Sequence, residues 1–353
     1  MKKLFENVRI GNLNLRNRIG MAPMTRSRAL ADGTPSDLAV DYYGQRSSVG
    51  LIISEGTQPS DDGQGYPNTP GIYTKAHIAG WRKITSKVHS EGGKLFIQLM
   101  HVGRVAHPDN TPHHRQPIAP SAIAPNSEIF TAEGMKEIPT PRALLLNDIP
   151  DVINEFRVAA RAAVEAGADG VEIHGANGYL IQQFLSENAN HRNDAYGGSI
   201  ENRSRFAIEV AKAIVDEIGA ERTGIRFSPQ GTLNGIEEGY SNIDMYRYLI
   251  AELNKLNLAY LHIMNFGNEP FMKEIRELWS QALLLNRPGR PLDQLSLDVD
   301  AELADVVTVG TWLISNPDFV ERLKVGAPLN EPDRNTMYAG GAAGYIDYPT
   351  LSN

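Results

Sequence analysis

The chain has 353 residues, of which 41% are hydrophobic, so it can bury a large core either as two ordinary domains or as one closed α/β barrel. Its formal net charge of -8 at pH 7 argues against a nucleic-acid partner, because such binding depends on a basic face of the protein. The absence of cysteine excludes disulfides, thiolate catalysis, cysteine-rich zinc sites and cysteine-ligated iron–sulfur clusters, and it fits a cytoplasmic protein.

The N-terminal segment carries no sign of a targeting or membrane sequence. Residues 1–7 are basic, but no apolar segment follows them, and no stretch approaches the ~20 apolar residues of a membrane span. Residues 8–18 predict a β-hairpin around Gly11 and Asn12, placed where it could close the bottom of a barrel. We therefore expect a cytoplasmic protein with no membrane partner.

Eight short runs rich in Val, Ile, Leu and Phe follow along the chain, and each ends in a polar or glycine-containing cluster. They predict buried parallel strands at residues 18–23, 51–55, 94–100, 170–174, 224–228, 260–264, 282–285 and 306–310. Helical patterns lie between them, most clearly at residues 148–167, 199–219, 242–257 and 316–326. Because no linker rich in Ser, Gly or Pro interrupts these units, they favour a single (β/α)8 TIM barrel domain over residues 1–353, rather than two doubly wound domains.

Residues 101–146 form a long insertion after the third strand, rich in Pro and His. Loops at the carboxyl ends of barrel strands line the active site, so we expect this insertion to shape a lid or substrate wall. Its histidines are His101, His107, His113 and His114. Their irregular spacing, with no carboxylate at ligand spacing, favours solvent-exposed loop histidines over a metal site.

The fourth predicted strand ends in the cluster with the most chemistry. Within six residues it delivers the imidazole of His174, the carboxamide of Asn177 and the phenol of Tyr179. Two hydrogen-bond donors and a proton donor in one small volume are what the reduction of a polarised double bond requires. Other strand ends add polar or small residues that would surround the same mouth and suit a flat heterocycle, namely Pro23, Thr25, Gly56, Gln98 and Arg226.

Together these residues resemble the old yellow enzyme family of FMN-dependent ene reductases, and the resemblance runs the whole chain. The motifs that carry it are Asn17-Arg18-Ile19, Ala22-Pro23-Met24-Thr25-Arg26, Gln98-Leu99-Met100-His101-Val102-Gly103-Arg104, His174-Gly175-Ala176-Asn177-Gly178-Tyr179, Tyr196-Gly197-Gly198-Ser199-Ile200-Glu201-Asn202-Arg203, Gly224-Ile225-Arg226-Phe227-Ser228-Pro229, Asn316-Pro317-Asp318 and Gly344-Tyr345-Ile346-Asp347-Tyr348-Pro349.

The resemblance implies that FMN lies at the barrel mouth, with NADPH or NADH as reductant. Flavin N5 would then pass hydride to the C=C bond of an α,β-unsaturated carbonyl or nitro compound. The implied cofactor-binding residues are Pro23, Met24, Thr25, Gly56, Gln98, Arg226, Gly289, Arg290, Gly310 and Thr311. His174 and Asn177 would bind the activating oxygen of the substrate and Tyr179 would donate the proton, in a pocket also lined by Tyr66, Met100 and Tyr345. We expect small-molecule activated alkenes as partners, no metal, and a monomer or homodimer.

The chain departs from the family pattern where the flavin phosphate should bind. Most relatives carry a Gly-Arg pair after strand eight, but this chain has Gly310-Thr311, and the loop after strand seven contains Pro288, which has no N–H to donate. Either Arg290 or Arg287 on that loop supplies the missing charge, or FMN is held less tightly than usual.

Two other classes of function remain open on the sequence alone. A metal-dependent barrel hydrolase would use the histidine-rich insertion and bind zinc. A non-catalytic barrel that has lost its flavin would explain the altered phosphate loops.

Overall fold

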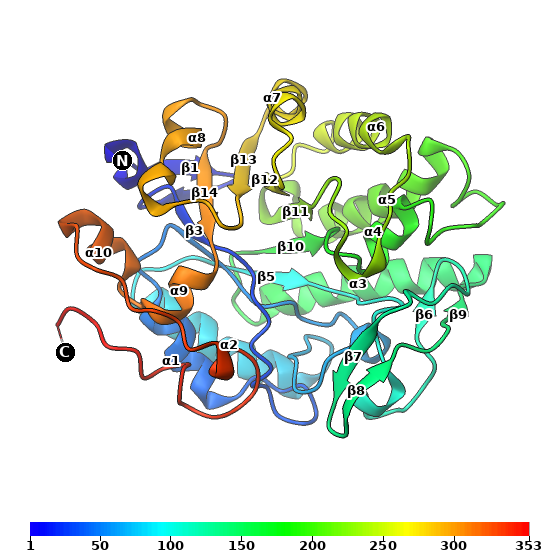
Figure 1. Ribbon diagram of the computed structural model, residues 1–353, viewed down its shortest axis with the longest axis horizontal. Helices are drawn as coiled ribbons and strands as arrows, with labels where there is room; N and C mark the ends of the chain where they lie inside the picture. The colour runs from blue at the N-terminus through cyan, green and yellow to red at the C-terminus, as the bar shows by residue number, and fades with distance from the viewer. Residues whose placement is uncertain (353) are drawn as a thin grey trace.

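The computed structural model describes residues 1–352 and contains one closed barrel of eight parallel strands (Figure 1). In chain order the barrel strands are β3 (Ile19–Met21), β4 (Leu51–Ile53), β5 (Leu95–Leu99), β10 (Gly170–His174), β11 (Thr223–Phe227), β12 (Tyr260–Met264), β13 (Ala282–Asn286) and β14 (Val306–Val309). Each pairs with its neighbours in this order, and β3 closes the barrel against β14. The predicted (β/α)8 TIM barrel is confirmed.

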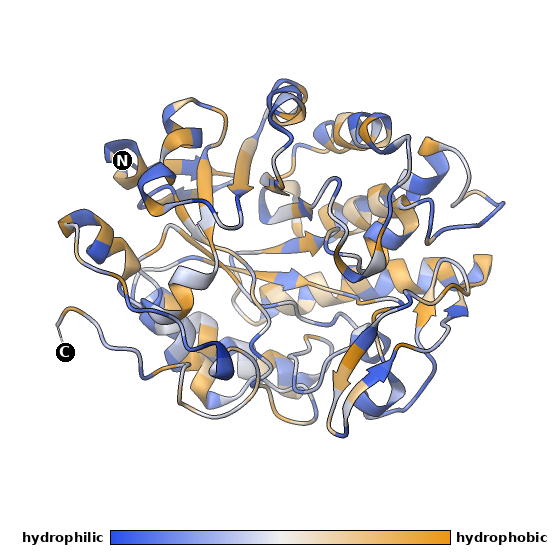
Figure 2. Cartoon of the chain, viewed as in Figure 1, coloured by the Kyte–Doolittle hydropathy of each residue, from blue (hydrophilic) through white to orange (hydrophobic). Residues whose placement is uncertain are grey.

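Helices surround the barrel (Figure 1). The longer ones are α1 (Asp37–Gln45), α2 (Lys75–Ser90), α3 (Ile149–Glu165), α5 (Ile200–Ile218), α6 (Asn242–Asn254), α7 (Glu269–Leu278) and α10 (Phe319–Val325). The short helices are α4 (Leu180–Leu185), α8 (Leu297–Asp300) and α9 (Thr311–Ser315). Figure 2 shows the pattern behind this arrangement, since the barrel strands are mostly hydrophobic and the outer helices carry both hydrophobic and hydrophilic residues.

Most predicted boundaries differ from the structure by only a few residues. The strand expected at 18–23 ends earlier, because Ala22 donates the last ladder hydrogen bond to Val309 and Pro23 has no N–H to continue it. The helix expected from residue 316 begins at Phe319 instead. The Asn316 side chain donates to the Trp312 and Asn330 carbonyls, so it fixes the preceding turn.

The two additions to the barrel lie at opposite ends. Strands β1 (Val8–Ile10) and β2 (Leu13–Leu15) form the predicted hairpin, and Ile10 and Leu15 pack against the starts of the barrel strands. The insertion 101–146 forms two small sheets, β6 (Ile118–Ala119) with β9 (Arg142–Ala143) and β7 (Glu128–Thr131) with β8 (Gly134–Glu137). Within residues 1–352 no helix is long and apolar enough to cross a membrane.

Candidate active site

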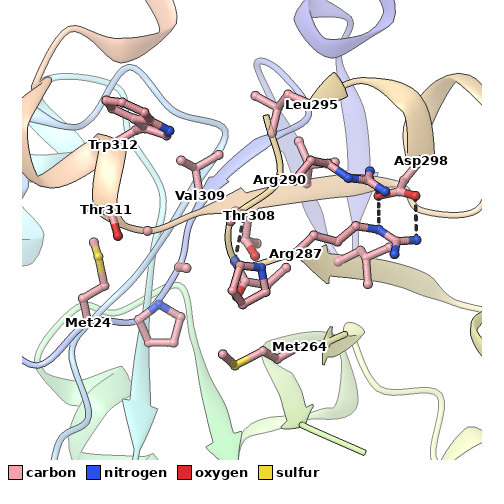
Figure 3. A pocket seen from close by; sticks show the side chains of 18 of the residues that line it. Met24, Met264, Arg287, Arg290, Leu295, Asp298, Thr308, Val309, Thr311 and Trp312 are labelled. Atoms are coloured by element: carbon pink, nitrogen blue, oxygen red, sulfur yellow. Dashed lines mark hydrogen bonds and ion pairs between the residues drawn. The ribbon is translucent and has the colours of Figure 1, made fainter. Parts of the chain in front are cut away.

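Two adjoining cavities open at the carboxyl ends of the barrel strands. The first, of about 550 Å³, lies over β13 and β14, and we call it the β13–β14 cavity (Figure 3). The second, of about 720 Å³, lies over β4, β5 and β10, and we call it the β4–β10 cavity. Pro23, Met24, Asn177 and Thr311 line both, so the two form one continuous site.

The structure brings together all but one of the site residues expected from the sequence. The β13–β14 cavity is lined by Pro23, Met24, Asn177, Arg226, Gly289, Arg290, Gly310 and Thr311. The β4–β10 cavity adds Thr25, Gly56, Tyr66, Gln98, Met100, His174 and Tyr179. Phe130 from β7 lines this second cavity as well, so the insertion forms part of its wall as expected.

Tyr345 is the exception, and the expectation that it walls the pocket needs correction. Its ring is fully buried, stacks on Tyr42 at a centroid distance of 4.1 Å, and lies 4.5 Å from the Arg28 guanidinium. These aromatic and cation–π contacts hold it in a separate cluster outside both cavities. The C-terminal segment instead contributes Met337, Tyr338 and Ala339 to the β4–β10 cavity.

One insertion histidine, His101, differs from the expectation of exposed loop residues, whereas His114 is exposed and His107 and His113 are partly exposed. His101 is buried, its Nδ1 accepts the backbone N–H of Gly103, and burial lowers the pKa of its imidazole to about 4. It follows β5 directly and its ring packs near Phe156 of α3, which explains the burial. In the described part of the chain no three His, Asp or Glu side chains gather as a metal site would require.

A buried polar network crosses the barrel interior beneath the cavities. Gln98 Nε2 donates to Glu172 Oε1 at 2.7 Å, and the other carboxylate oxygen lies 2.8 Å from His262 Nδ1. His262 Nε2 lies 2.9 Å from the Thr308 hydroxyl. Burial would raise the pKa of Glu172, but His262 and Arg226 outweigh it and hold that pKa below its ordinary value. The network fixes the Gln98 amide group beneath the cavity.

Arg226 is the least satisfied polar side chain of the site. It is only 3% exposed, its Nε and Nη1 atoms have no hydrogen-bond partner within residues 1–352, and Nη2 reaches Asn286 Oδ1 at a long 3.4 Å. Buried donors without a partner are costly. Arg226 is therefore a cation at the cavity wall with two donors that an electron-rich ligand could satisfy.

His174 is held as a neutral hydrogen-bond donor. Its Nδ1 lies 3.3 Å from the backbone N–H of Ala176 and accepts it, which leaves the proton of the neutral ring on Nε2. Burial, together with the charge of Arg226, lowers the pKa of His174 to about 3. The imidazole is therefore neutral at physiological pH, with Nε2–H as its donor.

Asn177 sits in a left-handed backbone conformation, with φ of +57°. Ser228 accepts its N–H at 3.0 Å, and Asn234 donates to its carbonyl at 2.7 Å. These bonds support a conformation that is unusual outside glycine. They hold the side chain at the junction of the two cavities, where its Oδ1 atom has no partner within the described chain.

Tyr179 caps the start of α4 and points its hydroxyl at Tyr66, with the two oxygens 3.0 Å apart. Its ring also lies edge-on to His174, with centroids 5.0 Å apart. Burial and the neighbouring Tyr66 hold the pKa of Tyr179 well above its ordinary value. The phenol therefore keeps its proton at neutral pH.

Several residues of this site were not identified from the sequence. Glu172 and His262 belong to the buried network, and each is a titratable residue in the middle of a buried strand, which is a usable signal. Ser228 and Asn234 give no such signal, because only the folded loop shows what they hold.

Comparison with known proteins agrees with this geometry. Residues 3–330 match the family described as NADH:flavin oxidoreductase / NADH oxidase. The chain is 39% identical to 12-oxophytodienoate reductase 2 of Arabidopsis thaliana, over 98% of this chain and 95% of that protein. It is also 39% identical to a probable flavin mononucleotide-dependent alkene reductase of Leishmania infantum, over 97% of this chain and 96% of that protein.

Among solved structures, morphinone reductase in complex with tetrahydroNAD superposes with a TM-score of 0.95 at 42% identity, covering 99% of this chain and 98% of that one. Neither the metal-dependent hydrolase nor the flavin-free barrel is favoured by these relatives. The chain belongs to the NADH:flavin oxidoreductase / NADH oxidase family, the family of the old yellow enzymes.

Proposed function

We propose that this chain reduces the activated C=C bond of an α,β-unsaturated carbonyl or nitro compound with bound FMN as the hydride donor. In this proposal His174 and Asn177 bind the activating oxygen and Tyr179 donates the proton. As a member of its family, the chain is an FMN-dependent NAD(P)H oxidoreductase and an ene reductase. The observation that carries the residue roles is the shared cavity, in which a neutral histidine donor, a carboxamide and a protonated phenol lie side by side.

The cavity residues fit FMN. The two free donors of Arg226 suit the electron-rich edge of the ring system, and the Gln98 amide suits its hydrogen-bonding edge. Pro23, Met24, Thr25 and Gly56 would contact the rings, and Gly289, Arg290, Gly310 and Thr311 the phosphate end. Bound FMN would supply the hydride transfer from the nicotinamide to the β-carbon of the alkene.

The role of His174 and Asn177 is to stabilise the oxygen that activates the alkene. As hydride reaches the β-carbon, negative charge moves to that carbonyl or nitro oxygen. Nε2–H of His174 and the side-chain amide of Asn177 then bind the developing charge more strongly than the neutral substrate, which is the condition for acceleration. Ala176 N–H and the Ser228 and Asn234 contacts position these two groups.

The role of Tyr179 is to protonate the α-carbon. A phenol is a weak acid, but the α-carbon of the anion formed by hydride addition is a strong base. The Tyr66 hydroxyl at 3.0 Å can donate to Tyr179 once its proton has left. Proton transfer is thus supported by a second phenol in the same cavity.

Steady-state kinetics with both substrates tests whether nicotinamide and alkene bind in the same cavity. Because nicotinamide and alkene use one cavity, and the sequence has no G-x-G-x-x-G fingerprint for a separate nicotinamide site, NADPH oxidation with a cyclic enone, a maleimide or a nitroalkene should show ping-pong kinetics. Parallel double-reciprocal plots are expected. A ternary complex holding nicotinamide and enone together would contradict the shared cavity.

The enone half-reaction should be insensitive to pH between about 5 and 8. The pKa of His174 is about 3, so the ring stays neutral across this range, and the raised pKa of Tyr179 keeps that phenol protonated. Stopped-flow reoxidation by cyclohexenone at a series of pH values measures this. A rate that rises as the pH falls through 6.5, and loses this rise in His174→Asn, would mean that an imidazolium is the donor instead.

Several expectations rest on the sequence alone and stay predictions. These are the organisation of residues 1–353 as a single domain, the cytoplasmic location, the monomer or homodimer, and the absence of a nucleic-acid partner.

A further inference from the structure

Besides Arg290, the far end of the β13–β14 cavity is lined by Arg287 and Asp298, two charged residues to which the proposed function gives no role. The family pattern expected from the sequence puts an arginine after strand eight, but this chain has Thr311 there, which brings no charge. The same end of the cavity is lined by Arg287 and Arg290 from the loop after β13 and by Asp298 from α8 (Figure 3). The two arginines differ in how many of their guanidinium nitrogens make hydrogen bonds.

Asp298 and Glu269 engage every nitrogen of the Arg287 guanidinium. Nε and Nη2 of Arg287 donate to the two Asp298 oxygens at 2.8 and 2.9 Å. Nη1 donates to Glu269 Oε1, and Nη2 also donates to Glu269 Oε2 at 2.8 Å. Asp298 is itself only 5% exposed, so this is a buried carboxylate whose charge Arg287 neutralises.

Within the described residues, one nitrogen of the Arg290 guanidinium makes a hydrogen bond. Its Nη1 atom donates to Asp298 Oδ2, and within residues 1–352 its Nε and Nη2 atoms make no hydrogen bond. Its side chain is 18% exposed and lines the cavity. The carboxylate thus anchors one corner of the guanidinium and leaves the other donors available to a ligand.

The unpaired donors of Arg290 suit an anion. Arg287 and Arg290 together balance the charges of Asp298 and Glu269, and in the described part of the chain Arg290 is the arginine that keeps unpaired donors at the cavity wall. A flavin phosphate carries close to two negative charges at neutral pH and accepts several hydrogen bonds. A buried carboxylate beside it would repel it unless an arginine such as Arg287 compensates.

We propose that Arg290 binds the phosphate of FMN, that Asp298 positions Arg290, and that Arg287 serves to neutralise Asp298. This rests on the proposed function in one respect, since it takes FMN as the ligand of the cavity. Arg290, held by the Asp298 carboxylate, would then supply from the neighbouring loop the positive charge that Thr311 lacks.

Titration of the flavin-free protein with FMN and with riboflavin, followed by quenching of flavin fluorescence, tests the assignment. Riboflavin lacks only the phosphate. Arg290→Ala and Arg290→Gln should each weaken FMN binding by about ten- to a hundredfold, the range for losing a charge-assisted hydrogen bond, and leave riboflavin binding unchanged. Arg247→Ala removes an equal charge from an exposed site on α6 and should change neither.

The role of Arg287 needs a second pair of variants. Arg287→Ala should weaken FMN binding because Arg290 alone then offsets the charge of Asp298. Adding Asp298→Asn removes that charge but keeps an oxygen that can accept from Arg290, so it should restore binding to within a few fold of the parent. If Arg287 bound the phosphate directly, the double variant would stay as weak as Arg287→Ala, and the division of roles would be wrong.

The two flavin titrations distinguish a failure of the proposed function from a failure of the phosphate assignment. A parent protein that binds neither flavin would contradict the proposed function itself. A parent protein that binds both flavins, with FMN held equally tightly by Arg290→Ala, would overturn only the phosphate assignment.

Discussion

Replacing Tyr179 with Phe is expected to slow flavin reoxidation by a cyclic enone about 10²- to 10⁴-fold while leaving flavin reduction by NADPH near the parent rate. Only the reaction with the alkene needs a proton on carbon. Stopped-flow absorbance of each half-reaction separates the two steps. A nitroalkene should be affected less, because a nitronate is stable enough to leave unprotonated and take its proton from water.

Tyr345→Phe is the matched control for this variant. It also removes one buried phenol hydroxyl, but Tyr345 lies outside both cavities, so both half-reactions should keep the parent rate. Equal losses in the two half-reactions of Tyr179→Phe would show that Tyr179 is structural.

His174→Ala and Asn177→Ala should each slow the enone half-reaction by about 2 to 4 kcal/mol of transition-state stabilisation, which is the usual cost of one oxyanion donor. Phenol binding should weaken in the same variants, because a phenol oxygen takes the place of the activating oxygen. Flavin content should stay near normal, since neither side chain belongs to the proposed phosphate or ring contacts. Rapid-reaction kinetics and a phenol titration measure the two effects.

His174→Asn provides the comparison, because it keeps a side-chain donor while it removes the imidazole. It should lose less than His174→Ala. Enone reduction at the parent rate in both alanine variants would exclude the oxygen-binding role.

The barrel and its mouth could be predicted because both follow from local patterns. Buried parallel strands are nearly continuous in apolar residues, and their carboxyl ends meet at one rim, so polar residues at strand ends such as Gln98, His174 and Arg226 had to converge. The structure places all three at the cavity walls.

What the sequence did not predict depends on contacts between distant segments. Tyr345 belongs to a family motif, yet its ring packs against Tyr42 and Arg28 instead of lining the cavity. Both contacts lie some 300 residues earlier in the chain. His101 belongs to an irregular loop by sequence but packs near Phe156 of a helix beyond the insertion. The sharing of Asp298 between two arginines likewise appears only when α8 folds against the loop after β13.

We infer that the two cavities, as one continuous site, bind FMN and pass hydride from nicotinamide to an activated alkene. The absorbance spectrum of the purified protein tests it most directly, recorded before and after anaerobic NADPH and again after a cyclic enone. We expect a yellow protein that releases FMN on denaturation, loses its flavin absorbance with NADPH and regains it with the enone. A colourless protein that cannot be reconstituted with FMN would contradict it.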